Sequence, residues 1–583
     1  MDPLLDVHNL SVEFSRNHAN LRAVEGISFQ LRQQETIGIV GESGSGKSVT
    51  ALSIMRLISG PGKITSGEIY FGAESRTNLL TLPETQMQHF RGREIAMIFQ
   101  EPMTSLNPVF TCGNQVTEAI HLHLKLEKQQ AMEHALHLFE EVKLSDPHRI
   151  FRAYPHQLSG GQKQRVMIAM AMSCNPALLI ADEPTTALDV TVQARILELM
   201  AELKEQHRMS MIFISHDLGV VSQIAQRVLV MYRGKIVEQG DVSKIFRQPE
   251  HPYTKGLIAC RPPLNRKLKR LPVTSDFMNE YGEELTTTVT ATPGNKDLEV
   301  PADYTINRLN LLQSQKPLLS VRNFSVSFHN HQMSRRHAAA VNAVSDVSFD
   351  VYPGETLGLV GESGSGKTTL GRAILQLIKP SSGEVIFKER NLSSISITDL
   401  KKLRKDLQII FQDPYSSLNP RLTIGYSIME PMKAHGLLVN DKERKEKTIG
   451  LLRKVNLPED SFNRYPHEFS GGQRQRICIA RALAVNPAFI ICDECVSSLD
   501  VSIQAQVLNL LMQLREEFNL TYIFISHDLS VVKFMSDRIA VMNQGRIEEL
   551  APADEIYEHP ATTYTRKLIS AIPKGEHFTH SKQ

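Results

Sequence analysis

Two short apolar runs, each followed by a glycine-rich turn, mark equivalent places in the two halves of the chain. Residues 36–40 and 356–360 are brief and almost continuously apolar, which predicts buried strands. After each turn, apolar residues recur at helical spacing. These positions are Ala51, Leu52, Ile54, Met55 and Leu57 in the first half and Leu370, Ile374, Leu375 and Leu377 in the second. Each half therefore contains a strand, a tight turn and a helix in succession.

Helical and strand patterns then alternate along each half. Helical spacing extends over residues 125–142 and 441–455, and apolar runs that predict strands return at 177–181 and 211–215. This alternation predicts an α/β fold with a mainly parallel sheet covered by helices, because parallel strands need long crossover connections. We interpret the long helical stretch in the middle of each half as a helical subdomain.

The second half of the chain repeats the first. The phrase Ser-Gly-Gly-Gln, the pair Asp-Glu and the phrase Phe-Ile-Ser-His-Asp each return after 311 residues, whereas the two glycine-rich turns are 320 residues apart. Such a repeat indicates two copies of one fold. We predict a first domain over 1–260, a linker over 261–316, a second domain over 317–575 and a C-terminal tail over 576–583.

The linker carries a weak apolar pattern and a segment rich in Thr, Pro and Gly at 287–294. This composition predicts a mostly irregular segment. It holds 8 Lys or Arg residues against 7 Asp or Glu residues, so it is not a basic arm. A flexible chain of this length reaches roughly 40 Å, which is enough for two domains to face each other.

The composition is that of an ordinary soluble globular protein. The chain of 583 residues is 22% charged and 41% hydrophobic, and its net charge of +2 gives no sign of a nucleic-acid partner. No apolar run approaches the about 18–20 residues that a membrane span requires. The first residues lack the basic and apolar regions of a secretion signal, so we expect none.

The cysteines are scattered, several of them within apolar runs, which favours reduced thiols in a cytosolic protein over a disulfide framework. They are Cys112, Cys174, Cys260, Cys478, Cys492 and Cys495. Cys492 and Cys495 form a C-x-x-C pair. We assign that pair no redox or metal role, because the two carboxylates between its cysteines have a better explanation below.

The two glycine-rich turns fit the phosphate-binding pattern G-x-x-x-x-G-K-[S/T]. Glycines allow backbone N–H groups to point at phosphate oxygens, and the N-terminus of the following helix adds partial positive charge. The lysine would reach the β- and γ-phosphates, and the last hydroxyl, from Ser48 or Thr368, would bind Mg²⁺. The predicted ATP-binding residues are Gly41, Glu42, Ser43, Gly44, Ser45, Gly46, Lys47 and Ser48, and Gly361, Glu362, Ser363, Gly364, Ser365, Gly366, Lys367 and Thr368.

A pair of carboxylates follows a later apolar run in each half. Asp182 and Asp493 end predicted strands, where a carboxylate can hold Mg²⁺. The next residues, Glu183 and Glu494, are placed to polarise an attacking water as a general base. An ordinary turn at the end of a strand is the alternative. The order of the pair after a phosphate-binding turn argues against it.

The repeated phrase Ser-Gly-Gly-Gln resembles the signature sequence of the ABC-type ATPases, and every element occurs in that family's order in both halves. The resemblance covers nearly the whole chain except the linker. It implies tandem P-loop NTPase domains, each a RecA-like core sheet with helices and a helical subdomain. It also implies that the two domains pair within the chain, so that each signature completes the other's ATP site. The implied ligands are Ser159, Gly160, Gly161, Gln162, Ser470, Gly471, Gly472 and Gln473.

The resemblance also assigns residues that act on the γ-phosphate. Gln100 and Gln412 match the glutamines that contact Mg²⁺ and the attacking water, at the junction with the helical subdomain. His216 and His527 match the switch histidines that hold the γ-phosphate. A single histidine after a strand is more often structural, but both histidines occur in the phrase Ile-Ser-His-Asp.

The remaining implied positions concern the loop between the sites and the adenine. Asp189 and Asp500 match the loop that links the two sites. Phe14 and Phe328 would stack on adenine, with a core phenylalanine as the alternative. The usual Asp-Glu-Pro becomes Asp-Glu-Cys at Cys495. Both sites keep every motif residue, so we predict two hydrolytic sites.

Two more repeated stretches narrow the branch of the family. Residues 101–108 and 413–420 end in Leu-Asn-Pro, and His-Pro begins the segments 251–257 and 559–568 that close the two halves. These patterns are similar to those of the oligopeptide, dipeptide and nickel uptake ATPases. Many members of that branch carry a cysteine cluster after the second pattern. None follows Cys260, so we expect no iron–sulfur cluster.

This resemblance implies an ATPase that couples hydrolysis to import, with di- or oligopeptides as the leading cargo. Its implied partners are two integral-membrane permease subunits and, indirectly, an extracytoplasmic substrate-binding protein, with no nucleic acid. It implies a peripheral protein at the cytoplasmic face of the bacterial plasma (inner) membrane.

Other functions stay open. Within import, nickel, glutathione or another small solute are alternative cargoes. A soluble twin ABC ATPase that acts on ribosomes or nucleic acid is the main alternative outside transport. The linker of the present chain is near-neutral and rich in Thr and Pro. This argues against the ribosome-acting class, for which a basic helical linker is expected. A purely structural dimerisation protein conflicts with two complete sets of catalytic residues.

Overall fold

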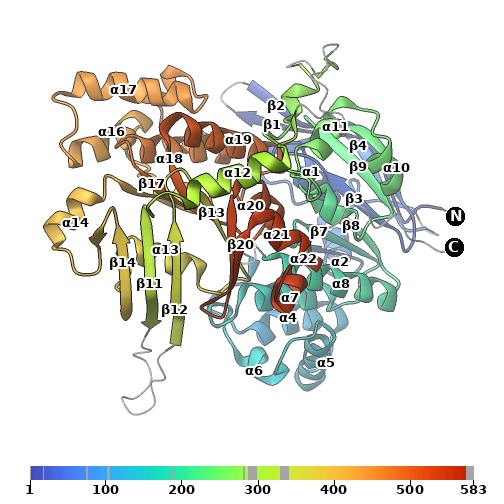
Figure 1. The fold of residues 1–583 in the computed structure, drawn as a ribbon. Helices are drawn as coiled ribbons and strands as arrows, with labels where there is room; N and C mark the ends of the chain where they lie inside the picture. The colour runs from blue at the N-terminus through green and yellow to red at the C-terminus, as the bar shows by residue number, and fades with distance from the viewer. Residues whose placement is uncertain are drawn as a thin grey trace.

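The computed structural model describes residues 2–16, 19–73, 76–100, 105–186, 188–279, 282–285, 298–328 and 341–572. The described residues form two lobes of the same construction that lie side by side (Figure 1). We refer to residues 2–260 as the first lobe and to residues 317–572 as the second lobe.

Each lobe contains the predicted alternation of strands and helices. The first lobe consists of β1 (Leu5–Arg16), β2 (Ala19–Leu31), β3 (Thr36–Val40), α1 (Lys47–Ile54), β4 (Gly62–Phe71), β5 (Thr77–Asn78), α2 (Glu84–Phe90), β6 (Ile95–Ile98), α4 (Cys112–Leu124), α5 (Lys128–Glu141), α6 (Pro147–Arg152), α7 (Gly160–Met172), β7 (Leu178–Asp182), α8 (Val190–His207), β8 (Ser210–Ser215), α9 (Leu218–Val221), β9 (Arg227–Tyr232), β10 (Lys235–Asp241), α10 (Val242–Arg247) and α11 (Pro252–Ala259).

The second lobe follows the same order. It consists of β11 (Leu319–Phe328), β12 (Val341–Val351), β13 (Thr356–Val360), α13 (Lys367–Ile374), β14 (Ser382–Phe387), β15 (Arg390–Asn391), α14 (Ile397–Leu403), β16 (Leu407–Ile410), α15 (Pro414–Ser417), α16 (Ile424–Ala434), α17 (Asp441–Lys454), α18 (Gly471–Leu483), β17 (Phe489–Asp493), α19 (Val501–Phe518), β18 (Thr521–Ile525), α20 (Leu529–Met535), β19 (Arg538–Asn543), β20 (Arg546–Pro552), α21 (Ala553–Glu558) and α22 (Thr563–Ser570).

A six-stranded sheet forms the centre of each lobe, in the order β10-β9-β3-β8-β7-β6 and β16-β17-β18-β13-β19-β20. All neighbours run parallel except the antiparallel edge pairs β9–β10 and β19–β20. Strands β3 and β13 are buried along their whole length, as expected for apolar strands covered on both faces. Parallel strands end at one edge of the sheet, and this edge brings the phosphate loop, the carboxylate pair and the histidine together.

A second, antiparallel sheet covers each central sheet, in the order β2-β1-β4-β5 and β12-β11-β14-β15. A hydrophobic core fills the space between the two sheets of each lobe and includes apolar residues of α1 or α13. Alternation of buried and exposed residues in β11 shows why one face of this sheet meets the core. The helix after each phosphate loop is therefore held between two sheets.

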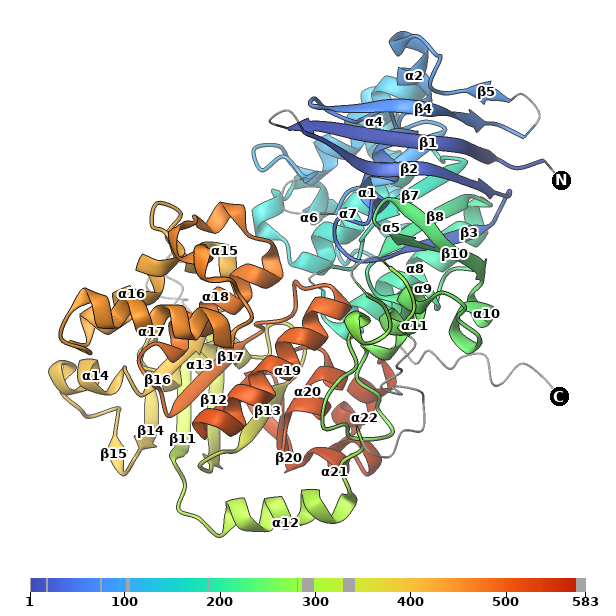
Figure 2. The same ribbon diagram turned by 90° about the horizontal axis from the view of Figure 1, so that it is seen from above.

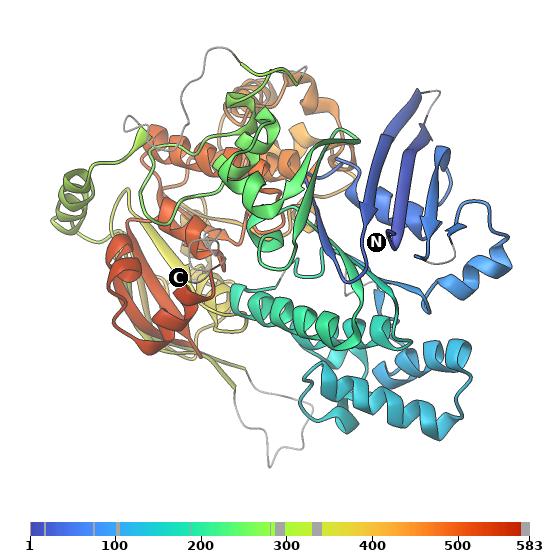
Figure 3. The same cartoon turned by 90° about the vertical axis from the view of Figure 1, so that its right-hand side faces the viewer.

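The predicted helical subdomains are present, with α4–α7 in the first lobe and α16–α18 in the second. The predicted stretches 125–142 and 441–455 correspond to α5 and α17. Figure 3 shows the cyan helices of the first subdomain gathered at one side of the first lobe. Their buried apolar residues belong to the same core cluster as one face of the central sheet, so each subdomain is joined firmly to its sheet.

Part of the linker forms a helix that the sequence analysis did not predict. Residues Ala302–Gln313 form the helix α12, which lies on the outer side of the second lobe, away from the first (Figure 2). Earlier in the linker, Leu268, Leu271 and Val273 are buried in the core cluster of the second lobe. The linker is therefore docked onto the second lobe by both of these described parts. The docking was not predicted because only a few apolar side chains of the linker take part in it, and these give no periodic pattern in the sequence.

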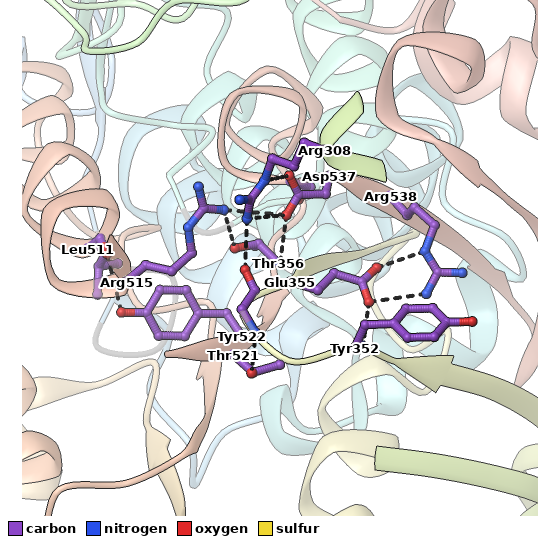
Figure 4. Close-up of polar contacts among 12 residues, drawn as sticks. Arg308, Tyr352, Glu355, Thr356, Leu511, Arg515, Thr521, Tyr522, Asp537 and Arg538 are labelled. Carbon is purple, nitrogen blue, oxygen red and sulfur yellow. Dashed lines mark hydrogen bonds and ion pairs between the residues drawn. The ribbon is translucent and has the colours of Figure 1, made fainter. Parts of the chain in front are cut away.

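A buried ion cluster holds α12 on the second lobe (Figure 4). Arg308 of α12 donates from Nε to Oδ1 of Asp537 at 2.7 Å, and Arg515 of α19 lies 3.4 Å from Oδ2 of the same carboxylate. Asp537 also accepts the backbone N–H of Thr356, at the start of β13, at 2.9 Å. In the first lobe, the side chain of Gln226 accepts the corresponding N–H at 2.6 Å. The N–H at the start of this strand is therefore bound by a neutral amide in the first lobe and by a carboxylate with cationic partners in the second.

Within the described parts of the chain, no helix is both long enough and apolar enough to cross a membrane.

Candidate nucleotide sites

Each phosphate loop bridges the end of a buried strand and the start of a helix, as predicted. Gly46, the N-cap of α1, has φ of 103°, and a Cβ there would lie 2.6 Å from the carbonyl oxygen of Ala23. Only glycine fits this conformation and this close approach. Gly366 has φ of 102° in the second lobe. The shape of both loops is thereby fixed by their last glycine.

The lysine of each loop is buried and turned back onto the loop itself. Lys47 donates from Nζ to the carbonyl oxygens of Gly41 and Glu42 at 2.7 and 2.9 Å. Lys367 makes the same two bonds at 2.8 and 2.9 Å. Burial lowers the pKa of both lysines, against the opposing effect of nearby carboxylates. A buried cation in such a position is stabilised by an added anion.

Two further observations indicate that the loops can bind a polyphosphate. The hydroxyls of Ser45 and Ser365 are buried and have no hydrogen-bond partner among the described residues. A Cβ added at Gly44 would meet nothing within 4 Å, so the backbone there is open on that side. Free donors at a helix N-terminus are typical of phosphate sites.

A carboxylate faces the last hydroxyl of each loop. Ser48 donates from Oγ to Oδ1 of Asp182 at 3.0 Å, and Thr368 donates to Oδ1 of Asp493 at 2.8 Å. Burial raises the pKa of Asp182 to about 6, although the bond from Ser48 opposes this. Oδ2 of Asp493 is buried without a hydrogen-bond partner among the described residues. A hydroxyl and an under-coordinated carboxylate are oxygen ligands that suit Mg²⁺.

Three side chains converge on one carboxylate oxygen in the first lobe. Oε2 of Glu183 accepts from Nε2 of Gln100 at 3.1 Å and from Oγ1 of Thr186 at 2.9 Å. Nδ1 of His216 lies 3.3 Å from the same oxygen. The predicted glutamine, glutamate and histidine, which come from three separate segments, therefore meet at one atom.

The second lobe repeats this convergence with one difference. Oε2 of Glu494 accepts from Nε2 of Gln412 at 3.0 Å and lies 3.3 Å from Nδ1 of His527. Ser497, which corresponds to Thr186, donates to the backbone carbonyl of Glu494 at 3.0 Å. The second glutamate therefore has one fewer bond of this kind to its side-chain oxygen.

The glutamate and the histidine of the first lobe shift each other's pKa. Burial raises the pKa of Glu183, but the hydrogen bond and charge of His216, with Thr186 and Lys47, lower it to about 2. Burial lowers the pKa of His216, but the hydrogen bond and charge of Glu183, with the charges of Asp500 and Asp217, outweigh this and raise it. Glu183 and Glu494 both have φ of 48°, in the left-handed region that costs energy for a residue with a side chain. Such strain is concentrated at functional sites.

Each signature serine is the N-cap of a helix. Ser159 accepts the N–H of Gln162 at 3.3 Å, and Gln162 accepts the N–H of Ser159 at 3.0 Å. Ser470 and Gln473 form the same capping box at 3.4 and 3.0 Å. The glutamine side chains thus stabilise the helix start, a role that the sequence analysis did not assign.

The two lobes contact each other at the phosphate loops. Ser43 of the first loop donates its N–H to Oδ2 of Asp500 at 2.9 Å, and Ser363 of the second donates to Oδ2 of Asp189 at 3.3 Å. In each lobe the signature helix packs beside this aspartate. Gly160 lies 3.7 Å from Leu188 when measured from an added Cβ. Each signature is therefore on the side of its lobe that faces the other lobe's phosphate loop.

A cavity of about 100 Å³ lies between these contacts and is lined by residues of both lobes, among them His216 and His527. Phe14 and Phe328 lie in the outer antiparallel sheets. Phe14 is half-buried beside Gly62, whereas the side chain of Phe328 is 47% exposed. Their stacking on adenine stays a prediction.

The comparison with family models fits this geometry. The model described as ABC transporter matches residues 24–186 and 344–497, one segment in each lobe. The chain belongs to the ABC transporter family. A second model, described as oligopeptide/dipeptide transporter, C-terminal region, matches residues 237–280 and 549–580. The predicted branch of the ABC family is thereby confirmed, as is the fold of two P-loop ATPase domains.

Among curated ABC relatives, the glutathione import ATP-binding protein GsiA of Shigella dysenteriae serotype 1 is 48% identical over 584 residues, which cover 98% of this chain and 90% of that protein. GsiA of Escherichia coli strain K12 gives the same identity and coverage. The solved dimeric ATP-binding cassette MJ0796, bound to ADP and Pi, is 30% identical over 40% of this chain and 98% of its own, with a TM-score of 0.37. The chain of 583 residues is therefore an ATPase coupled to transport, and it is the ATP-binding subunit of an ABC importer.

Several polar contacts at these ABC sites were missed by the sequence analysis. Thr186 and the capping glutamines are examples, and so is Arg372 of α13, which lies 3.7 Å from Oδ2 of Asp493. Within the described parts of the chain, no three His, Cys, Asp or Glu side chains are grouped to hold a metal. All six cysteines are buried free thiols. The expectation about an iron–sulfur cluster stays a prediction.

The contact between the two ABC lobes can be tested at Asp500. Asp500 makes no cap bond to α19, whereas Asp189 also caps α8 by accepting the N–H of Val192 at 2.9 Å. Replacing Asp500 with Ala should therefore lower ATP turnover about tenfold, because one charge-assisted bond across the lobes is lost. It should leave the thermal midpoint unchanged. Replacing Asp189 with Ala should lower both, since a lost cap costs about 1 kcal/mol. Normal turnover in the Asp500 variant would contradict the role of this contact.

Proposed function

We propose that this protein hydrolyses ATP to drive the import of short peptides through separate membrane subunits. The tripeptide glutathione is the first candidate cargo. The observation that carries this proposal is the 48% identity, over 98% of the chain, to relatives named glutathione import ATP-binding proteins. Di- and oligopeptides in general are the wider class, as the C-terminal family match suggests. In this proposal, 1–260 and 317–575 are the two ATPase domains and 261–316 is the linker.

In each site, the phosphate loop would bind the β- and γ-phosphates of ATP. The lysine would exchange its bonds to two loop carbonyls for bonds to phosphate oxygens, which suits a buried cation. Mg²⁺ would be held by Ser48, Asp182 and Gln100 in the first site and by Thr368, Asp493 and Gln412 in the second, and would neutralise phosphate charge. The hydroxyls of Ser45 and Ser365 would find their missing partners on the same phosphates.

Glu183 and Glu494 would accept the proton of the attacking water. With a pKa of about 2, Glu183 is ionised but is a weak base as long as it pairs with His216. When His216 turns to the γ-phosphate, Glu183 loses its main counter-charge, its pKa rises and it becomes a stronger base. Gln100, which bonds the same oxygen, lies at the junction with the helical subdomain and would report this change.

The signature of each lobe would close the opposite site. Asp189 and Asp500 already bring each signature helix toward the other lobe's phosphate loop. Ser159 with Gly160 and Gly161, and Ser470 with Gly471 and Gly472, would then offer a hydroxyl and helix-terminal N–H groups to the γ-phosphate. Gln162 and Gln473 would act mainly through their capping boxes.

The partners in this proposal are two permease subunits at the cytoplasmic face of the inner membrane, with a substrate-binding protein outside. Exposed aromatic residues near the glutamines and the signatures offer a docking surface, because large exposed apolar groups mark interaction sites. They are Phe99, Phe110 and Tyr154 in the first lobe and Phe411, Tyr415, Tyr426 and Tyr465 in the second.

The test is purification from native membranes followed by reconstitution with the co-purified subunits in lipid vesicles. We expect two permeases to accompany the protein. We also expect glutathione to stimulate ATP turnover in the presence of the binding protein, with di- and oligopeptides and Ni²⁺ as parallel samples. Stimulation by another peptide instead of glutathione would support peptide import but would show that glutathione is not the cargo. Stimulation by Ni²⁺ alone, or recovery of a soluble protein without permeases, would contradict the proposal.

A further inference from the structure

A short C-terminal appendage closes each lobe and reaches back to the phosphate loop. It consists of α10 and α11 (residues 242–259) in the first lobe and of α21 and α22 (residues 553–570) in the second (Figure 1). Tyr253 of α11 and Tyr564 of α22 occupy equivalent positions, 311 residues apart. Tyr253 is fully buried, and Tyr564 is half-buried. Neither tyrosine belongs to the nucleotide-binding set described above.

Both tyrosine hydroxyls contact the second residue of a phosphate loop. The N–H of Glu42 donates to Oη of Tyr253 at 2.9 Å, and the N–H of Glu362 donates to Oη of Tyr564 at 3.2 Å. The carbonyl of Glu42 accepts from Lys47, and the next N–H, from Ser43, donates to Asp500 of the other lobe. Three successive backbone groups are thus held by the appendage, by the catalytic lysine and by the opposite lobe.

The appendages are anchored in the same way in both lobes. The carboxylate of Glu238, in β10, accepts the N–H groups of Glu250 and His251 at 2.9 and 3.0 Å. Glu549, in β20, accepts the N–H groups of Ala561 and Thr562 at 2.9 and 3.2 Å. These bonds fix the turn that precedes α11 or α22, so the position of each tyrosine is set by the central sheet.

The first tyrosine is also fixed through its ring. The rings of Tyr253 and Tyr232 lie 4.4 Å apart between centroids, and Tyr232 ends the strand β9 beside β3. The nitrogen Nδ1 of His251 accepts the N–H of Tyr253 at 3.1 Å, which caps α11. The hydroxyl therefore has little freedom to move away from the loop.

We propose that Tyr253 and Tyr564 are positioning residues for ATP binding, which hold the start of each phosphate loop in the conformation that receives the phosphates. This inference rests on the assignment of ATP to these loops. It makes the C-terminal region of each lobe part of the nucleotide site. Without the hydroxyl, the N–H of Glu42 or Glu362 would lose its partner in a largely buried place, and the loop would populate other conformations.

The test compares Tyr253→Phe, Tyr564→Phe and the double variant with the wild-type chain in its complex with permeases. Each single change removes one hydroxyl and keeps the ring. We expect the Kd for MgATP and the KM to rise about fivefold at the altered site, which corresponds to one hydrogen bond, with a smaller change in kcat. The effect should be greater for Tyr253, whose bond is shorter and more buried.

Tyr557→Phe is the matched control. Tyr557 lies in the same appendage of the second lobe, and its hydroxyl donates to the carbonyl of Leu529 rather than accepting from the phosphate loop. This variant should keep the wild-type Kd and KM, even where it lowers the thermal midpoint as much as the test variants do. An equal rise of KM in the control, or wild-type ATP affinity in both test variants, would overturn the inference. Absence of ATP turnover in the wild-type complex would instead overturn the proposed function.

Discussion

Replacing Glu183 and Glu494 together with Gln should reduce steady-state ATP hydrolysis by at least about 10²-fold, the usual contribution of a general base. Each glutamate presents one oxygen to a glutamine and a histidine that come from separate segments. The amide keeps the shape of the carboxylate but accepts no proton. ATP binding should persist, because the phosphate loops are unchanged.

The measurement is phosphate release under saturating MgATP, together with the Kd for MgATP. Glu202→Gln is a suitable control, since Glu202 is exposed on α8 and pairs only with a surface lysine, Lys143, among the contacts described. It should leave turnover unchanged. The single variants Glu183→Gln and Glu494→Gln show whether both sites must hydrolyse ATP in each transport cycle. Turnover within a few-fold of wild type in the double variant would refute the assigned base.

Replacing Asp537 with Ala should destabilise the second lobe by about 3–5 kcal/mol, the cost of leaving buried charges without their partner. Arg308, Arg515 and Lys267 all place positive charge near this carboxylate. The N–H of Thr356, at the start of the strand that leads into the phosphate loop, would also lose its acceptor. The change should appear as a lower midpoint in urea unfolding.

The same cluster predicts a pH dependence. Burial raises the pKa of Asp537, but Arg515 and Arg308 outweigh it, so the folded-state pKa lies below the unfolded value of about 4. The carboxylate therefore contributes stability above pH of about 4 and loses it as the pH falls through the folded-state pKa. The difference between wild type and Asp537→Ala should shrink below pH of about 4. Gln226→Ala, at the neutral equivalent in the first lobe, should show no such dependence on pH. Equal stabilities of wild type and Asp537→Ala at pH 7 would contradict the role of the cluster.

Much of the fold could be predicted because the signals are local or repeated. The strands at 36–40 and 356–360 have the predicted bounds, since a short and mainly apolar run before a glycine-rich loop allows few other bounds. The family resemblance implied that Gln100, Glu183 and His216 act around the γ-phosphate, and the structure brings all three to one oxygen.

Other features depend on contacts between distant segments. The docking of α12 rests on Arg308 and a buried aspartate 229 residues later, which no periodicity reveals. Tyr253 reaches the phosphate loop across 211 residues. Its motif was recognised as a mark of the branch, but the acceptor role of its hydroxyl lies in three-dimensional geometry. The capping role of the signature glutamines was not predicted, because the same short sequence can form a capping box and a binding loop.

The docking of two parts of the linker onto the second lobe bears on how such a protein would be divided between two genes. Leu268, Leu271 and Val273 are core residues of the second lobe, and Arg308 is anchored there as well. Two separate polypeptides would therefore preserve these contacts if the boundary fell just before Arg261, so that the linker became a leader of the second polypeptide. A boundary after α12 would instead leave the second polypeptide with an exposed apolar surface and with Asp537 paired to Arg515 but no longer to Arg308.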